Sequence, residues 1–484
     1  MQRYIQNISL FLVFVIAFAL EVKSQNLQWS NPIKLKGPAV FTKVLGENEH
    51  GVFIMRYRNR FYSKNIILEK YSHLLALKEG KSVELRNARL MKVILSDKGI
   101  LLIKSKYIKS RKQNDLIGQW YDFNLKAVSS PKVIASTDSR EFGDRGNYRL
   151  RASDDRKTIS LLYTDETDTG NIVFYHRLLN DKLETLSSKD VELPYANDLF
   201  NINDFMVTNS GVVDFVCAIV DKKRKRILST EARLFRIEND QVSDYIISKD
   251  RVIKTSKLVY DRPNDRAVLT GFFGSQDEYG IEGSFFYHVD SSNKPQMISG
   301  RFGNSFISAV NINRKAEEKL AEGFEILKAV PRSDGGILLI AEQKDIATED
   351  DIIMVNGIPQ STSKNIFNFN ELLLINYDSA GFMDWYKVVT KNQTTVNDGG
   401  YFSSVVIYVG EKYIQLLYND QLRSTGDVMK YTLYNNGREE STKLLKTQME
   451  SVAVIPSESA QVASNKIIIP TSKNRRFALL KLQY

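Results

Sequence analysis

The first stretch with the composition of a chemical site is RSDGGILLIAEQKD, which begins at Arg332 and places Asp334, Gly335 and Gly336 before an aliphatic run. A Walker-type phosphate loop requires G-x-x-x-x-G-K-[ST] between a strand and a helix, because the amides at the helix N-terminus bind the phosphate. No such string occurs, and the residues after Gly336 are typical of a strand. Glycines can supply the positive φ angles of a tight hairpin. We therefore predict a turn between two strands here, not a ligand loop.

Histidine and cysteine form no metal-binding or catalytic pattern. His176 in FYHRLL and His288 in FYHVDS stand in similar contexts, and two histidines brought together can bind a metal or shuttle protons. Equivalent positions in different repeats, however, usually lie far apart, which favours a structural role for both. The single cysteine, Cys217, lies among apolar residues in GVVDFVCAIVD, which indicates burial. The sequence predicts no cofactor and no metal.

The elements that position any site are short strands separated by turns. Runs of apolar and aromatic residues alternate with Asn, Asp, Gly and Ser, as in YRLRASDDRKTISLLYTD followed by NIVFYHRLLNDKLETLS. A similar four-part order recurs in NDFMVTNSGVVDFVCAIVD followed by STEARLFRIENDQVSDYII, and in several further copies. A repeat of roughly 50 residues with four strands is typical of one blade of a β-propeller. We predict an all-β chain that folds as a single β-propeller.

The two ends of the chain give an independent prediction. The last segment, SVAVIPSESAQVASNKIIIPTSKNRRFALLKLQY, supplies three strands, and the N-terminal LQWSNPIKLKG supplies one. Pairing the N-terminal strand with the C-terminal three completes a blade and covers two exposed strand edges. This composite blade and seven complete copies give eight blades, and seven is the alternative if one weak copy is a decoration.

One copy carries a recognisable motif. SDGGILLIA followed by LLLINYDSAGFMDWYKVV includes Asp378, Gly381 and Trp385, and it resembles the DGG and K-L-D-x-x-G-x-x-x-W repeat of secreted bacterial β-propellers. It departs from that motif at Asn376, where the family usually has a lysine. The resemblance implies the fold and export, but no particular activity, because propellers host both enzymes and scaffolds.

Basic residues accumulate on the strands predicted to be innermost in each blade. A cluster of this kind can bind a carboxylate- or sulfate-bearing ligand through charge-assisted hydrogen bonds. Few acidic residues occur on the same strands, chiefly Asp204 and Glu325. Salt bridges with neighbouring strands are the alternative explanation. The candidate ligand or partner contacts are Arg89, Lys92, Arg149, Arg151, Lys254, Lys257 and Lys328, with Lys43 as a further inner-strand cation.

Two insertions interrupt the repeat, at about residues 301–322 and 344–368. The first contains NRKAEEKLAEGF from Asn313, which is rich in good helix formers and predicts a short helix. The second contains the apolar string DIIMVNGIP, which is costly to expose and must pack on the blades or meet a partner. Its candidate partner-binding residues are Ile352, Ile353, Met354 and Val355.

The N-terminus has the order of a secretory signal peptide. Arg3 precedes an apolar core from about Ile8 to Leu20, and small residues precede a cleavage site between Ser24 and Gln25. We expect a signal peptide over 1–24, a propeller over 25–484, and no transmembrane segment after cleavage. The mature chain is then exported to the periplasm or the cell surface, where nucleic acid is an unexpected partner despite the net charge of +10.

Two functional hypotheses from different classes fit these observations. The leading one is a non-catalytic interaction or scaffold module, in which loops on a rigid propeller bind a protein partner, with a cell-envelope assembly as one setting for it. The alternative is a carbohydrate-active protein that binds or cleaves an acidic glycan at a basic channel mouth. A glycosidase needs two carboxylates roughly 5–9 Å apart, and a sequence cannot pair carboxylates across blades.

Overall fold

The computed structural model describes most of the chain in a set of segments. These are residues 26–34, 41–57, 64–86, 88–139, 146–166, 170–196, 200–223, 226–249, 251–275, 280–289, 294–311, 319–321, 323–355, 358–420, 422, 427–445, 452–473 and 476–484. The expected signal peptide lies outside them. Within them the chain forms eight antiparallel sheets, as in the blades of a β-propeller, and in each of the four-stranded sheets consecutive strands of the chain lie side by side. The eight-blade prediction is confirmed. The chain divides into two compact units, residues 1–59, 67–82 and 405–484 in the first and 60–66 and 83–404 in the second.

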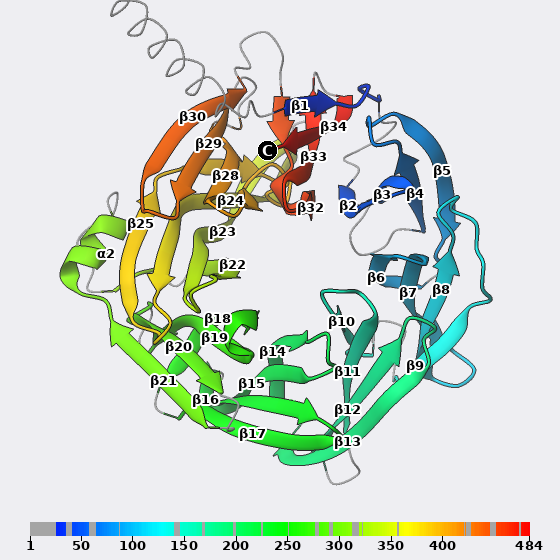
Figure 1. Ribbon diagram of the computed structural model, residues 1–484, viewed down its shortest axis with the longest axis horizontal. Helices are drawn as coiled ribbons and strands as arrows, with labels where there is room; N and C mark the ends of the chain where they lie inside the picture. The colour runs from blue at the N-terminus through cyan, green and yellow to red at the C-terminus, as the bar shows by residue number, and fades with distance from the viewer. Residues whose placement is uncertain are drawn as a thin grey trace, which may run out of the picture. The chain divides into compact units, whose positions relative to one another are not determined.

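The second unit holds five consecutive blades. Figure 1 shows that the first strand forms one edge of each blade and the last strand forms the opposite edge. First strands of successive blades contact one another. The blades are β6 (Arg89–Ser96), β7 (Gly99–Ile108), β8 (Gln113–Tyr121) and β9 (Lys132–Asp138); β10 (Arg149–Ala152), β11 (Thr158–Glu166), β12 (Asn171–Asn180) and β13 (Thr185–Ala196); β14 (Phe200–Val207), β15 (Val213–Lys223), β16 (Arg226–Glu238) and β17 (Gln241–Ser248); β18 (Val252–Asp261), β19 (Arg266–Gly274), β20 (Gly283–Val289) and β21 (Pro295–Arg301); and β22 (Phe324–Pro331), β23 (Ile337–Val355), β24 (Ile358–Tyr377) and β25 (Met383–Val389), with β26 (Gln393–Val396) added to β24.

The first unit contains the remaining blades, including one built from both ends of the chain. Its sheets are β2 (Phe41–Asn48), β3 (Gly51–Tyr57), β4 (Asn65–Tyr71) and β5 (Leu77–Glu84); β27 (Val406–Val409), β28 (Tyr413–Asn419), β29 (Val428–Tyr434) and β30 (Glu439–Leu445); and β31 (Val452–Val454), β32 (Ala460–Ala463), β33 (Lys466–Lys473), β34 (Arg476–Gln483) and β1 (Asn26–Trp29). β1 pairs with β34 in an antiparallel register. The predicted composite blade is therefore confirmed. Its first strand is split into β31 and β32 by the 3₁₀ helix η3 (Pro456–Glu458).

The DGG turn joins β22 to β23, as predicted from the sequence. Gly335 has φ +85°, and its amide donates to the carbonyl of Arg332 at 3.1 Å. Gly336 serves a different purpose, because a Cβ there would lie 2.5 Å from the carbonyl oxygen of Tyr377 on the neighbouring strand. Asn376, which departs from the family motif, is buried and accepts a hydrogen bond from Arg332 Nη1 at 2.6 Å. An arginine from the turn thus supplies a cation beside this position.

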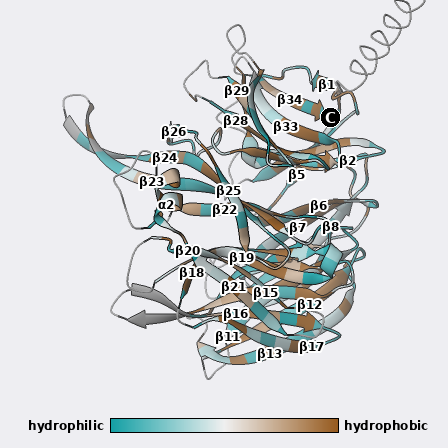
Figure 2. Ribbon diagram, turned by 60° about the vertical axis from the view of Figure 1, so that its left-hand side comes forward, coloured by the Kyte–Doolittle hydropathy of each residue, from teal (hydrophilic) through white to brown (hydrophobic). Residues whose placement is uncertain are grey.

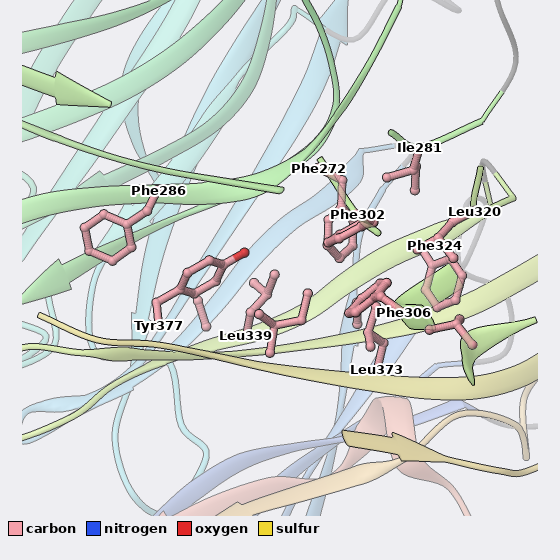
Figure 3. Packing of buried hydrophobic residues seen from close by; sticks show 14 of the residues in the cluster. Phe272, Ile281, Phe286, Phe302, Phe306, Leu320, Phe324, Leu339, Leu373 and Tyr377 are labelled. Atoms are coloured by element: carbon pink, nitrogen blue, oxygen red, sulfur yellow. The ribbon is translucent and has the colours of Figure 1, made fainter. Parts of the chain in front are cut away.

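The largest described core cluster joins the fourth and fifth blades of the second unit (Figure 3). Phe272 of β19 and Tyr377 of β24 belong to it, as do three buried residues of the short helix α2 (Asn304–Val310): Phe306, Ile307 and Val310. The helix thus lies upstream of the predicted helix at Asn313. Residues 313–318 and 322 of that prediction lie outside the described segments. Leu320 forms a β-bridge with Ile281 and Phe324 begins β22, so the predicted helix is wrong at its C-terminal end. The 3₁₀ helix η2 (Arg262–Asn264) links β18 to β19.

Candidate functional site

The structure places the seven predicted contact cations on the first strands of four blades. Arg89 and Lys92 lie on β6, Arg149 and Arg151 on β10, Lys254 and Lys257 on β18, and Lys328 on β22. Lys43 lies on β2 of the first unit. A bulge interrupts the pairing of each of the strands β6, β14, β18 and β22 near these positions. In β6 it lies between Leu90 and Lys92, and in β22 between Ile326 and Lys328. A bulge changes the direction of the side chains around it, so strand alternation alone does not say which of these cations face together.

Asp204 on β14 brings two of the predicted cations together. Its Oδ1 accepts a hydrogen bond from Arg151 Nη2 at 2.9 Å, and its Oδ2 lies 3.4 Å from Lys257 Nζ. Oδ2 also accepts from the backbone amide of Leu258 at 3.1 Å. Arg151 Nε donates to the carbonyl of Phe205 at 3.1 Å. Asp204 therefore ties the first strands of three successive blades together, and it neutralises part of the predicted basic surface.

Arg149 and Lys328 differ from that pair. Neither forms an ion pair with a described residue. Burial lowers the pKa of the Arg149 guanidinium and of the Lys328 ammonium, because water that would solvate each charge is displaced by protein. The acidic inner-strand residue Glu325 lies elsewhere: its Oε2 is 2.7 Å from Lys344 Nζ. The predicted cations therefore lie on first strands, and the contacts given above bring Arg151 and Lys257 together at Asp204.

A cavity of about 650 Å³ opens among the strand ends and turns of the second unit. It is lined by residues that are not among the predicted site residues, including Asp154, Thr208, Ser210, Arg262 and Asp265. Arg262 forms an ion pair with Asp154, and the Tyr260 hydroxyl donates to Asp265. Both carboxylates are thus engaged by neighbouring groups. The signal in the sequence was the concentration of charge in the strings SDDRK and DRPNDR.

The two equivalent histidines are buried, in the third strands of different blades. His176 lies on β12 and His288 on β20. Burial lowers the pKa of His176 to about 4, and the positive charge of Arg177 adds to the effect. Neither ring nitrogen of His176 has a hydrogen-bond partner among the described residues. His176 therefore resides in the core as a neutral imidazole.

The depressed pKa of His176 predicts acid sensitivity. Above pH 6.5 the imidazole is neutral in the folded and the unfolded chain, so it imposes no penalty. As the pH falls from 6.5 toward 4, only the unfolded chain gains the proton, and stability is lost. Between pH 7.5 and pH 5 we expect this residue to cost about 2 kcal/mol of unfolding free energy. Urea denaturation at both pH values should show a smaller loss for His176→Leu, and equal losses would contradict the prediction.

The insertion predicted at about residues 344–368 extends two paired strands of its blade and does not form a loop. β23 and β24 continue together beyond the rest of their sheet, as Figure 2 shows, and they pair from Lys344↔Phe369 to Val355↔Ile358. We call residues 344–369 the arm. β26 pairs with its base, from Ile366↔Val396 to Phe369↔Gln393. The apolar string that looked costly to expose thus lies at the distal end of a two-stranded ribbon.

One face of the arm carries exposed apolar side chains. Ile346, Ile352 and Met354 are 63%, 72% and 66% exposed. All three occupy even-numbered positions of β23, and alternate residues of a strand point to the same face. Ile353 and Val355, the other two predicted partner contacts, belong to the same strand end, and their side chains are outside the described set. The acidic Asp350 lies between the apolar residues on this face.

A buried ion pair fixes the base of the arm. Lys391 Nζ lies 2.8 Å from Glu342 Oε1, and the two side chains are 1% and 0% exposed. Lys391 also donates to the carbonyl of Phe369 and to Gln393 Oε1, each at 3.0 Å, while Ser404 Oγ donates to Glu342 Oε2 at 2.7 Å. Glu342 immediately precedes the bulge at which β23 leaves the blade. The arm is therefore anchored at its root and exposed at its end.

Comparisons with known proteins do not provide a family. No family model and no curated protein matches the chain. Among solved structures, the polysaccharide lyase Uly1 is 13% identical, with 96% of this chain and 93% of that chain covered and a TM-score of 0.35. The β-propeller domain of the Trilobed protease from Pyrococcus furiosus is 10% identical, with 87% and 96% covered and a TM-score of 0.36. An ancestral GH74 enzyme is 8% identical, with 91% and 67% covered and a TM-score of 0.32. Similarities this distant say nothing of activity.

The eight sheets and their strand order define the class of protein, an eight-bladed β-propeller with a strand-built arm on its sixth blade in chain order. Among the described residues, no helix is both long and apolar enough to cross a bilayer.

Proposed function

We propose that this chain is an exported, non-catalytic interaction module that binds a protein partner through the arm, within an assembly of the cell envelope. The observation that carries the proposal is the exposure of Ile346, Ile352 and Met354 on one face of an anchored ribbon. Isolated apolar side chains are common on surfaces, but an apolar face on a projecting element is typical of an interaction site. Export rests on the order of residues at the N-terminus.

The buried base of the arm supports this proposal. A docking element binds more tightly when its conformation is fixed before binding, because less conformational freedom is lost on association. The ion pair between Lys391 and Glu342 and the added strand β26 both hold the root of the arm. The Lys344 ammonium, 5.3 Å from the ring centroid of Phe369, packs on the same region.

Substitutions at the end of the arm test the proposal. The double variant Ile352→Ser/Met354→Ser should reduce recovery of the partner at least tenfold, because exposed apolar anchors dominate such contacts. Its unfolding free energy should change by less than about 0.5 kcal/mol, since both side chains are exposed. The measurement is crosslinking of the tagged full chain in its native envelope, mass spectrometry of the recovered proteins, and titration of the purified partner.

A matched control separates the arm from general surface apolarity. Val128→Ser/Val133→Ser removes two side chains that are 61% and 51% exposed on another blade, and it should leave recovery unchanged. If the arm variant recovered as much partner as the control variant, the proposal would be contradicted. If the arm variant then also bound or cleaved an acidic glycan from a panel of oligosaccharides, the carbohydrate hypothesis would replace the proposal.

A further inference from the structure

The two edges of the arm are unequal. On the β24 side, β26 adds a strand from Ile366 to Phe369. On the β23 side, β22 ends its pairing at Phe324↔Gln343, and no described strand pairs with residues 345–350 of that edge. An open strand edge is a template for the addition of another extended segment. The arm has thus been extended once by its own chain, and it retains an open edge on the other side.

The direction of the backbone amides on that open edge follows from two hydrogen bonds. The amide of Lys344 donates to the carbonyl of Gly323 at 2.7 Å, so the even-numbered amides of β23 point away from β24. On the other strand, the carbonyl of Asn365 accepts from the amide of Asn397 at 2.9 Å, so the backbone groups of Asn365 point toward β26 and away from its cross-strand partner Thr348. Ile346, Thr348 and Asp350 therefore present their backbone groups to the open edge.

The charges along the arm select the kind of segment that can add there. β23 carries Asp345, Glu349, Asp350 and Asp351 in this region, whereas the whole chain has a net charge of +10. Lys364 is paired with Glu349 at 3.1 Å, and Lys344 is paired with Glu325. Opposite charges on neighbouring strands stabilise a sheet and like charges destabilise it. Pairing between the arms of two copies is thus disfavoured, and a cationic strand is favoured.

We propose that the open edge of β23 binds an extended, basic segment of the partner polypeptide as an additional strand. This inference rests on the proposed function and specifies its partner. Main-chain hydrogen bonds from Ile346, Thr348 and Asp350 hold the segment, and Asp345 and Asp350 select lysine or arginine side chains on its two faces. The exposed apolar side chains of the same strand contact the segment's apolar residues.

The test uses the full chain and defined eight-residue peptides followed by fluorescence anisotropy. A peptide of alternating lysine and valine should bind at least tenfold more tightly than one of alternating glutamate and valine. Adding N-methyl groups to two consecutive central residues blocks both peptide edges and should weaken binding at least tenfold. Retained binding of the methylated peptide, or no binding of the lysine peptide at 1 mM, overturns strand addition.

Variants of Thr348 test the edge of the protein itself. Thr348→Pro removes an outward amide without removing a β23–β24 hydrogen bond, because proline is tolerated at an open edge. Thr348→Ala is its matched control, since both variants lose the hydrogen bond between Thr348 Oγ1 and Asn365 Oδ1 at 2.9 Å. We expect at least a tenfold loss of affinity for the proline variant and less than a twofold change for the alanine variant. Equal effects overturn the proposal, and the methylated peptide decides the matter if the proline variant is misfolded.

The outcomes distinguish this inference from the proposed function. If Ile352→Ser/Met354→Ser loses the native partner while Thr348→Pro keeps it, the arm binds the partner through its side chains and strand addition is wrong. If both variants keep the partner, the proposed function itself is wrong.

Discussion

Replacing Lys391 with methionine is expected to lower the free energy of unfolding by about 3–5 kcal/mol, the largest effect of any single substitution considered for this chain. Glu342 is fully buried, and Lys391 is its closest cation. Without that ammonium the carboxylate stays in a low-dielectric interior, with the hydroxyl of Ser404 as its hydrogen-bond donor and Lys344 Nζ, 3.8 Å from Oε2, as the remaining cation. The carbonyl of Phe369 and the amide oxygen of Gln393 lose a donor as well.

A double substitution separates the pair from the individual side chains. Lys391→Met combined with Glu342→Leu removes both charges, and it should recover most of the stability lost in Lys391→Met alone. Chemical denaturation followed by circular dichroism gives both values. A loss below about 1 kcal/mol for Lys391→Met, or simple additivity of the two changes, would show that the pair does not hold the base of the arm.

The anchoring pair has a consequence for binding. The bulge between Glu342 and Lys344 is where β23 passes from the four-stranded blade into the arm. A weakened root lets the arm fluctuate before it binds, so ordering it costs more on association. The same side chains thus connect the stability of the blade to the docking of the partner.

The blades were predictable because their signals are local. Asp334, Gly335 and Gly336 mark a turn by their residue types, and the three C-terminal strands require a fourth. The arm was not predictable in the same way. Both its faces are exposed, so its strands lack the alternation of apolar and polar residues that marks a half-buried sheet. Its acidic residues, such as Asp350 and Asp351, are more typical of a loop than of a strand.

The helix shows how packing overrides propensity. NRKAEEKLAEGF contains good helix formers, yet the described helix is NSFISAV, from Asn304 to Val310. Serine, isoleucine, valine and phenylalanine are only moderate helix formers. Burial of Phe306, which stacks on Phe302 with ring centroids 4.1 Å apart, stabilises the helix through the core instead. Such a contact depends on residues brought together by the blades, and local sequence does not reveal it.

The charge network was predictable in part, because the repeat length gives the sequence separation between residues at corresponding positions of neighbouring blades. Arg151 precedes Asp204 by 53 residues, and Leu258 follows it by 54. Each separation is close to one blade repeat, so these residues occupy corresponding positions in neighbouring blades. Inner-strand residues one repeat apart are therefore candidates for contact. What the sequence does not give is the bulge between Ile202 and Asp204, which directs the carboxylate.

Replacing Asp204 with alanine is expected to cost about 3 kcal/mol, because the substitution leaves buried donors unpaired. The amides of Phe205 and Leu258 both lose their acceptor, and the charges of Arg151 and Lys257 lose the carboxylate between them. The two cations are partly exposed, so most of the loss comes from the amides and not from the ion pairs. Asp204→Asn keeps one acceptor oxygen and should cost about half as much.

A second aspartate of the same unit supplies the control for this prediction. Asp154 pairs with Arg262, but the two side chains are 73% and 62% exposed. Asp154→Ala should therefore change the unfolding free energy by less than about 1 kcal/mol. Chemical denaturation of the three variants under identical conditions gives the comparison. If Asp204→Ala and Asp154→Ala had equal effects, Asp204 would be an ordinary surface charge and the first strands of these blades would be held by apolar packing alone.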